Sequence, residues 1–293
     1  MNNPLFTGVC TALVTPFLDN KVNYPMVDML LRRQLDAGIS TVVIGGTTGE
    51  APTLTDVEKI ELVSRAKHYV GSACTIIAGT GSNCTQHAVT LSCEAEKAGA
   101  DALLVVSPYY NKASVEGLIA HYTAIAHSVT IPIILYNVPS RTGVDMPVQV
   151  YRALSAIPNI VGVKEASTDI TKIARIQREC PNHFTVWSGN DEQITPTMSL
   201  GAKGVVSVLS NLCPVETCAM VNAALVGDFT TASALQIRLL PLIDLLFCEV
   251  NPIPIKEAMG LIGYDCGGCR LPLTELSPEN HKKLSCYLAE FTK

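Results

Sequence analysis

The chain has little charge, few aromatic residues and no excess of basic side chains. Charged residues make up 16% and aromatic residues 5% of its 293 positions, whereas 48% are hydrophobic. This composition excludes intrinsic disorder, and it excludes collagen-like and coiled-coil sequences. Lys and Arg total 21 against 26 Asp and Glu, a formal net charge of −5. Because nucleic-acid binding needs a basic surface, we expect no nucleic-acid partner, although a local cationic pocket for a small anion is allowed.

The N-terminal segment MNNPLFTGVC lacks the features of a secretion signal, since it has neither a cationic start nor an unbroken apolar core. The longest uncharged run, 117–140, is long enough to span a bilayer but contains two His, two Pro and an Asn. We interpret it as a helix, a turn and a buried strand. We therefore predict a cytoplasmic protein without a membrane partner, whose eleven Cys are mostly small buried hydrophobic residues.

One pattern repeats along the first 225 residues: a short apolar run rich in β-branched residues, followed by a helical stretch. Apolar runs that do not alternate with polar residues indicate strands buried on both faces, hence a parallel sheet, and the strand–helix alternation indicates the α/β class. Eight such units favour a (β/α)8 TIM barrel over the alternative, an open doubly wound sheet. The predicted strands are 9–15, 41–46, 75–79, 102–107, 133–137, 160–164, 185–189 and 204–209.

Helix start and stop signals accompany the pattern. Thr55 and Glu58 fit a capping box, and Gly38 and Gly99 follow helices at positions that favour a left-handed residue. The predicted helices of the repeating units are 24–37, 56–70, 86–98, 115–128, 147–156, 170–180, 192–200 and 214–225.

The alternation stops after residue 225. Residues 229–249, 255–261 and 278–291 are predicted helices with no strand between them. No Ser- or Pro-rich linker precedes them, so we expect them to pack on the barrel. The sequence therefore predicts a barrel catalytic domain at 1–225 and a C-terminal helical extension at 226–293.

Polar residues at the carboxyl ends of barrel strands are the candidates for chemistry. Lys164 ends the sixth apolar run, and by alternation it shares a face with Gly162. Burying a charged Lys costs free energy, so a Lys inside a barrel suggests a function. An uncharged Lys can form a Schiff base with a carbonyl. That function predicts that Glu165 points away from it. A Lys at the barrel rim that reaches water stays an alternative.

Three other strand ends carry candidate side chains. In Gly45-Gly-Thr-Thr-Gly-Glu50, glycines allow close approach of a ligand, and hydroxyls with free N–H groups suit a carboxylate. No Gly-Lys-Ser/Thr follows, which excludes a Walker A loop. Tyr110 and Tyr136 could relay protons, and Arg141 could clamp a carboxylate. For each of these, an ordinary turn, a packed ring or a solvated charge stays open.

Two motifs point to cofactors only weakly. Gly79-Thr-Gly-Ser-Asn-Cys84 lacks the third Gly of a dinucleotide-binding turn, and Asp101 would begin a strand rather than end one. Cys266-Gly-Gly-Cys269 has the spacing of metal ligands but no partner pair, and the six His show no metal-binding spacing. We therefore expect neither NAD nor a metal.

Four motifs together are far more specific than any one alone. Gly45-Gly-Thr-Thr-Gly-Glu50, Ser107-Pro-Tyr-Tyr-Asn111, Tyr136-Asn-Val-Pro-Ser-Arg-Thr-Gly143 and Gly162-Val-Lys-Glu-Ala166 occur in this order. Through them the chain resembles, over essentially its whole length, the dihydrodipicolinate synthase family of pyruvate-dependent Schiff-base lyases. The resemblance implies condensation of pyruvate with L-aspartate 4-semialdehyde on the route to diaminopimelate and lysine, without a metal or organic cofactor.

The resemblance also implies roles for individual residues. Lys164 is similar to the Schiff-base nucleophile, and Tyr136, Thr48 and Tyr110 to a proton relay in which Tyr110 comes from the neighbouring subunit of a tight dimer. The substrate-binding residues that it implies are Thr47 and Thr48 for the pyruvate carboxylate, Arg141 for the semialdehyde carboxylate, and Gly189 and Val206 in the pocket wall.

The family further implies a homo-oligomer, a dimer of dimers, with L-lysine as a feedback inhibitor at the tight-dimer interface. Asn83, His87 and Tyr109 fit lysine-sensitive members, whereas Asp56 and Lys59 depart from the His pair of some members, so we predict moderate sensitivity. The matching positions are Ala51, Asp56, Lys59, Asn83, His87 and Tyr109.

Two other functions are compatible with parts of the sequence. N-acetylneuraminate lyase and 2-keto-3-deoxy sugar-acid aldolases, which are sibling Schiff-base aldolases, would share Lys164 and Tyr136. The presence of both Arg141 and Tyr110 favours the synthase over these siblings. A non-catalytic binding protein on the same fold should have lost the lysine, and Lys164 is intact.

Overall fold

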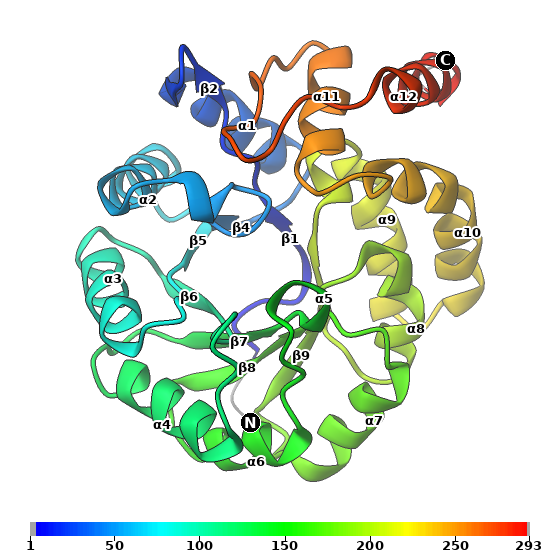
Figure 1. Ribbon diagram of the computed structural model, residues 1–293. Helices are drawn as coiled ribbons and strands as arrows, with labels where there is room; N and C mark the ends of the chain where they lie inside the picture. Colours follow the sequence, from blue (N-terminus) through cyan, green and yellow to red (C-terminus); the bar gives the residue numbers. More distant parts are fainter. Residues whose placement is uncertain (1–3, 292–293) are drawn as a thin grey trace.

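The computed structural model describes residues 4–291, and its centre is a closed ring of eight parallel strands. Figure 1 shows this ring with helices around it. Each strand pairs with its neighbours in parallel register, so the predicted (β/α)8 barrel is confirmed. The strands are β1 (Gly8–Ala12), β4 (Thr41–Ile44), β5 (Thr75–Gly79), β6 (Ala102–Val106), β7 (Ile133–Asn137), β8 (Ile160–Glu165), β9 (Thr185–Ser188) and β10 (Gly204–Ser207).

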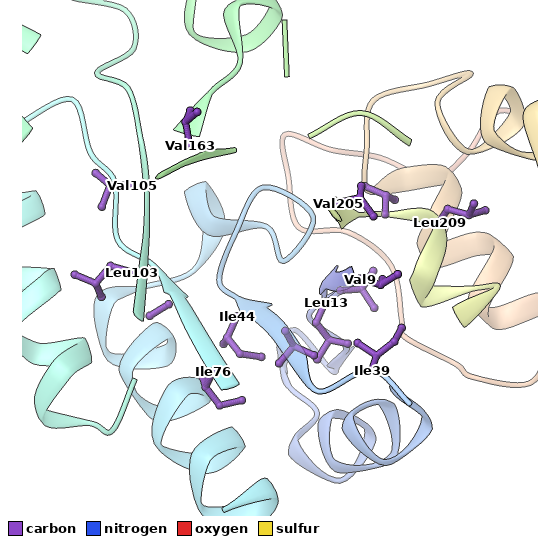
Figure 2. Close-up of a cluster of buried hydrophobic side chains, with 14 of the residues drawn as sticks. Val9, Leu13, Ile39, Ile44, Ile76, Leu103, Val105, Val163, Val205 and Leu209 are labelled. Carbon is purple, nitrogen blue, oxygen red and sulfur yellow. The ribbon is translucent and has the colours of Figure 1, made fainter. Parts of the chain in front are cut away.

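The strands are buried on both faces because alternate side chains enter two different hydrophobic clusters. One cluster lies between the sheet and the helices, and Figure 2 shows Val9, Ile76 and Val205 among its members. The neighbouring positions Cys10, Ile77 and Val206 belong to a second cluster, which fills the inside of the barrel. Burial on both faces explains why the strands read as unbroken apolar runs.

The helices of the repeating units lie close to their predicted positions. Thr55 and Glu58 form the predicted capping box, and Gly38 and Gly99 have φ of +83° and +98°, as predicted for left-handed helix ends. The helices are α1 (Tyr24–Asp36), α2 (Asp56–Val70), α3 (Thr85–Lys97), α4 (Val115–Ala126), α6 (Val148–Leu154), α7 (Ile170–Glu179), α8 (Ile194–Ser199) and α9 (Pro214–Leu225).

The differences from the predicted elements gather at the carboxyl ends of the strands. Several predicted strands are too long, because the chain leaves the sheet early and forms short helices in the loops. The predicted helix 192–200 is likewise split. The elements missed are the hairpin β2 (Phe17–Leu18) and β3 (Lys21–Val22), the short helix α5 (Pro139–Thr142), and the 3-10 turns η1 (Ala51–Thr53), η2 (Asp191–Gln193) and η3 (Leu209–Asn211).

The C-terminal extension consists of α10 (Phe229–Leu246), α11 (Ile253–Leu261) and α12 (Pro278–Phe291). The predicted boundary falls in the turn between α9 and α10, and Figure 1 shows α11 between α1 and α12. By length and composition α10 could cross a membrane, a test that core helices also pass, and 33% of it is buried. The run 117–140 forms α4, a turn and β7, as interpreted from the sequence.

The prediction for the cysteines is only partly right. Cys10, Cys74, Cys180, Cys213 and Cys266 are buried, but others lie at the surface because the extension and the helix ends expose them. The exposed ones are Cys84, Cys248 and Cys286. Within residues 4–291, His, Cys, Asp and Glu side chains form no cluster of three or more suited to a metal ion.

Candidate active site

Lys164 lies near the carboxyl end of β8, inside the barrel, and is 5% exposed. The strand register places Tyr136 of β7 on one side of it and Trp187 of β9 on the other. The Lys164 Nζ atom is 4.2 Å from the centre of the Tyr136 ring. Two aromatic neighbours therefore enclose a lysine that is not at the rim, so the alternative of a water-exposed rim Lys is excluded.

The base of this site is shaped by a glycine and the only tryptophan. Gly162 shares the inner face of β8 with Lys164, as the alternation predicts. A Cβ atom at Gly162 would lie 2.7 Å from the Trp187 ring and 2.1 Å from the Thr185 carbonyl oxygen, so only glycine fits here. Trp187 is fully buried and stacks on Phe6 at 4.7 Å between ring centres. The indole thus closes the barrel below the lysine.

Glu165 points away from Lys164, as the Schiff-base function predicts. Its carboxylate accepts hydrogen bonds from Asn137 Nδ2 at 2.8 Å and from the Tyr151 hydroxyl at 2.9 Å, on the helix side of the sheet. The Lys172 Nζ atom lies 3.7 Å from it. Burial and the neighbouring Glu165 carboxylate raise the pKa of Tyr151 well above its usual value, so the Tyr151 hydroxyl stays protonated and acts as a hydrogen-bond donor.

A second acidic group, Asp191, interacts with Lys164 and was missed by the sequence reasoning. Asp191 is 2% exposed, and its Oδ2 atom accepts hydrogen bonds from the backbone N–H groups of Val208 and Leu209, each at 2.9 Å. Burial raises the pKa of Asp191 above its ordinary value, while the Ser207 hydroxyl, these N–H groups and the Lys164 charge oppose the rise. No strand-end pattern marks Asp191, because it lies in η2.

A cavity of about 590 Å³ opens at the carboxyl ends of β4 to β7. Its size is that of a small-molecule site. It brings together Thr47 from the end of β4 with Tyr136 and Arg141 from the end of β7. The same cavity is also lined by five of the predicted lysine-site residues: Ala51, Asp56, Lys59, His87 and Tyr109.

Thr48 is buried next to this cavity and is held by the C-terminal extension. The Asn251 side chain donates from Nδ2 to Thr48 Oγ1 at 3.0 Å, and the Asn251 carbonyl accepts from Arg141 Nη2 at 3.4 Å. The Asn251 Oδ1 atom is buried and has no hydrogen-bond partner among residues 4–291. Sequence reasoning missed Asn251 because it lies 203 positions from Thr48, in a loop that no motif marks.

Tyr110 is the one predicted relay residue that the chain does not bring to the site. Its side chain is 90% exposed, its φ is +71°, and it does not line the cavity, whereas its neighbour Tyr109 does. A left-handed backbone is unusual for a bulky residue, and here it accompanies a ring that projects outward from the loop.

Gly189 and Val206 lie inside the barrel rather than in the cavity lining. A Cβ atom at Gly189 would lie 3.1 Å from Lys164 Cε, so glycine leaves room beside the lysine. Val206 is 1% exposed and belongs to the inner cluster. Gly189 is therefore next to the predicted nucleophile, and Val206 belongs to the same inner cluster as Trp187. Neither residue lines the cavity.

The part of the cavity lined by the predicted lysine-site residues contains three charged or titratable side chains that contact one another. Asp56 Oδ2 is 2.7 Å from His87 Nε2, and Asp56 Oδ1 is 3.6 Å from Lys59 Nζ. Burial raises the pKa of Asp56, but the hydrogen bond and charge of His87, with Lys59, outweigh it and lower the pKa. Asn83 is not in the lining, and its carbonyl accepts from Asn111 Nδ2 at 2.9 Å.

Comparison with known proteins gives a consistent result. A sequence model described as the Dihydrodipicolinate synthetase family matches residues 5–290. A 4-hydroxy-tetrahydrodipicolinate synthase of Exiguobacterium sp. is 48% identical over 290 residues, 99% of each chain. The crystal structure of dihydrodipicolinate synthase from Aquifex aeolicus has a TM-score of 0.97 at 42% identity, over 98% of each chain. The enzyme from Cyanidioschyzon merolae, with lysine bound, has a TM-score of 0.95 at 38% identity, over 98% of each chain.

Proposed function

We infer the function of this chain from its family and its site. The chain belongs to the Dihydrodipicolinate synthetase family, and it is a 4-hydroxy-tetrahydrodipicolinate synthase, a lyase. Its substrates are pyruvate and L-aspartate 4-semialdehyde. The observation that carries this function is the placement of Lys164: buried, beside Tyr136, and with Glu165 turned to the opposite face of β8. A buried lysine at the carboxyl end of a barrel strand fits Schiff-base catalysis.

The reaction begins when Lys164 Nζ attacks the carbonyl carbon of pyruvate. Water leaves, and the protonated imine draws electrons from the neighbouring methyl group, so that a methyl proton can depart to give an enamine. The enamine carbon then attacks the aldehyde carbon of the semialdehyde, forming the new carbon–carbon bond, and the aldehyde oxygen takes up a proton. The amino group of the semialdehyde next attacks the imine carbon and displaces Lys164, which closes the ring and frees the enzyme. A tyrosine is a weak base on its own, so proton transfer is assigned to a relay of Tyr136, Thr48 and Tyr110.

Substrate binding is assigned to side chains around the lysine. The hydroxyls and N–H groups of Thr47 and Thr48 hold the pyruvate carboxylate. Arg141, at the cavity and bonded to the Asn251 carbonyl, anchors the carboxylate of the semialdehyde. Gly189 leaves space beside Lys164, and Val206 belongs to the apolar wall.

The proposed assembly is a homo-oligomer, a dimer of dimers, in which Tyr110 of one subunit completes the relay of its neighbour. The 90% exposed Tyr110 ring, on a backbone with φ of +71°, supports this role, because its own chain gives it no site to enter. We also propose a cytoplasmic location, as expected for a biosynthetic enzyme like its relatives.

L-Lysine is proposed as a feedback inhibitor of moderate strength, and the relative that has lysine bound supports the presence of a lysine site. Among the residues that line this part of the cavity, Asp56 is the carboxylate suited to a ligand ammonium group. It is already paired with His87 and Lys59, so lysine must displace these partners. Activity should fall partially at millimolar lysine, and full activity there would remove the proposal.

The experiment that tests the function is a substrate comparison. With pyruvate present, the protein should consume L-aspartate 4-semialdehyde, and it should not cleave N-acetylneuraminate or a 2-keto-3-deoxy sugar acid. The second candidate, a sibling aldolase, predicts the reverse. Arg141 at the cavity favours the first outcome, because it matches a carboxylate near the reacting carbon.

A further inference from the structure

A buried ion pair joins the hydroxyl loop of the site to the C-terminal extension. Lys256 Nζ lies 2.9 Å from Glu50 Oε1, and the two side chains are 2% and 0% exposed. The other carboxylate oxygen of Glu50 accepts from the Arg270 backbone N–H at 2.9 Å. Lys256 Nζ also donates to the Gly268 carbonyl at 2.7 Å and lies 4.4 Å from the Phe17 ring centre. The extension thus supplies the main donors to a carboxylate that ends the loop 45–50.

Stability does not explain why this pair is present. Taking two charges out of water costs several kcal/mol per ion, and an apolar pair of similar size is often as stable or more stable. A buried ion pair does, however, select one geometry for the segments that carry it. Its location therefore decides what it is for.

That location is directly beside the two proposed pyruvate-binding hydroxyls. Glu50 follows Thr47, Thr48 and Gly49, and its φ of +56° is a left-handed conformation that a residue with a side chain adopts only when it is held there. The same segment that carries Lys256 also carries Asn251, which bonds Thr48 Oγ1. The extension thus contacts the loop at two points, through a hydrogen bond to Thr48 and an ion pair with Glu50.

We infer that Lys256 is a positioning residue: through Glu50 it fixes the hydroxyls of Thr47 and Thr48 for pyruvate. This inference rests on the proposed function. It assigns the extension a part in catalysis that the barrel motifs alone do not contain. Lys256 itself touches no reacting atom.

The test removes the pair in two ways. Lys256→Met leaves Glu50 charged and buried, whereas Glu50→Leu combined with Lys256→Met leaves no unpaired charge. The control is Lys67→Met, which removes the less buried ion pair of Lys67 with Asp101, just ahead of β6. For each protein, the measurements are kcat, KM for pyruvate, the melting temperature, and the pyruvate adduct trapped on Lys164 by borohydride.

The double variant should melt near the unmodified protein, yet kcat/KM for pyruvate should fall about 10- to 100-fold, as expected for small misplacements of binding groups. The Lys164 adduct should still form at high pyruvate concentration, and Lys67→Met should keep full activity. If the folded double variant has the original kcat and KM, or if it cannot fold at all, the inference is wrong. An unmodified protein without adduct or condensation would instead contradict the proposed function.

Discussion

The two sides of the site are held by different means. Lys164 and Tyr136 lie on adjacent strands, and the ladder between β7 and β8 fixes their register. Thr48 lies in a loop and Arg141 in the short helix α5, and both form hydrogen bonds with Asn251 of the C-terminal extension. The barrel therefore sets the position of the proposed nucleophile, while contacts across the length of the chain set the groups proposed to recognise substrate.

The largest effect is expected at the strand side. Lys164→Met should lower condensation on the order of 10³-fold or more, because it removes the only proposed nucleophile. The remaining fold should be intact, since a methionine suits the apolar setting between Tyr136 and Trp187. Steady-state kinetics with a circular dichroism check of folding measures this. Appreciable activity in the folded variant would mean that the chemistry lies elsewhere.

A smaller effect, of a different kind, is expected at the loop side. Arg141→Ala should lower kcat/KM for the semialdehyde about 100-fold, because a charge-assisted carboxylate contact is lost. Imine formation with pyruvate should stay unchanged, and Arg141→Lys should be intermediate, since lysine lacks the bidentate fork. Trapping and turnover are measured on the same samples. Equal losses in both would contradict the assigned role.

Removing the contact between the C-terminal extension and the loop at Thr48 should have a still smaller effect on turnover. Asn251→Ala removes one hydrogen bond to Thr48 and is expected to reduce turnover about 10-fold, which corresponds to ~1.4 kcal/mol. A double-mutant cycle with Thr48→Val separates this contact from the others. Additive losses would indicate that the two side chains act independently, against the bond seen here.

The helix ring offers a change that should spare catalysis at neutral pH. Burial lowers the pKa of His121 on α4 from 6.5 to about 4. Between pH 6.5 and 4, His121 is protonated in the unfolded chain but stays neutral in the folded chain. Its contribution to the free energy of unfolding is therefore complete above pH 6.5 and is lost as pH falls toward 4. Urea unfolding should show a shallower pH dependence in His121→Gln over this range. An unchanged slope would show that another group causes the acid lability.

The same contrast explains what the sequence could predict. The barrel and the facing of Lys164 and Glu165 follow from alternation, which depends on neighbouring residues only. Asn251 and Lys256 were missed because their partners Thr48 and Glu50 lie more than 200 positions away. Asp191 was missed because it lies in a 3-10 turn, between the predicted strand 185–189 and the predicted helix 192–200, where no pattern marks it. The sequence thus names candidates on both sides of the site, such as Lys164 and Arg141. Only the folded chain shows that Asn251 and Lys256 hold the loop side.

The most direct test is to trap the protein with borohydride in the presence of pyruvate and to locate the adduct by mass spectrometry. A single pyruvate-sized modification on Lys164, absent without pyruvate, is the expected result. Folded protein that gains no adduct, or gains it on another lysine such as Lys172 or Lys256, would contradict Schiff-base catalysis at β8.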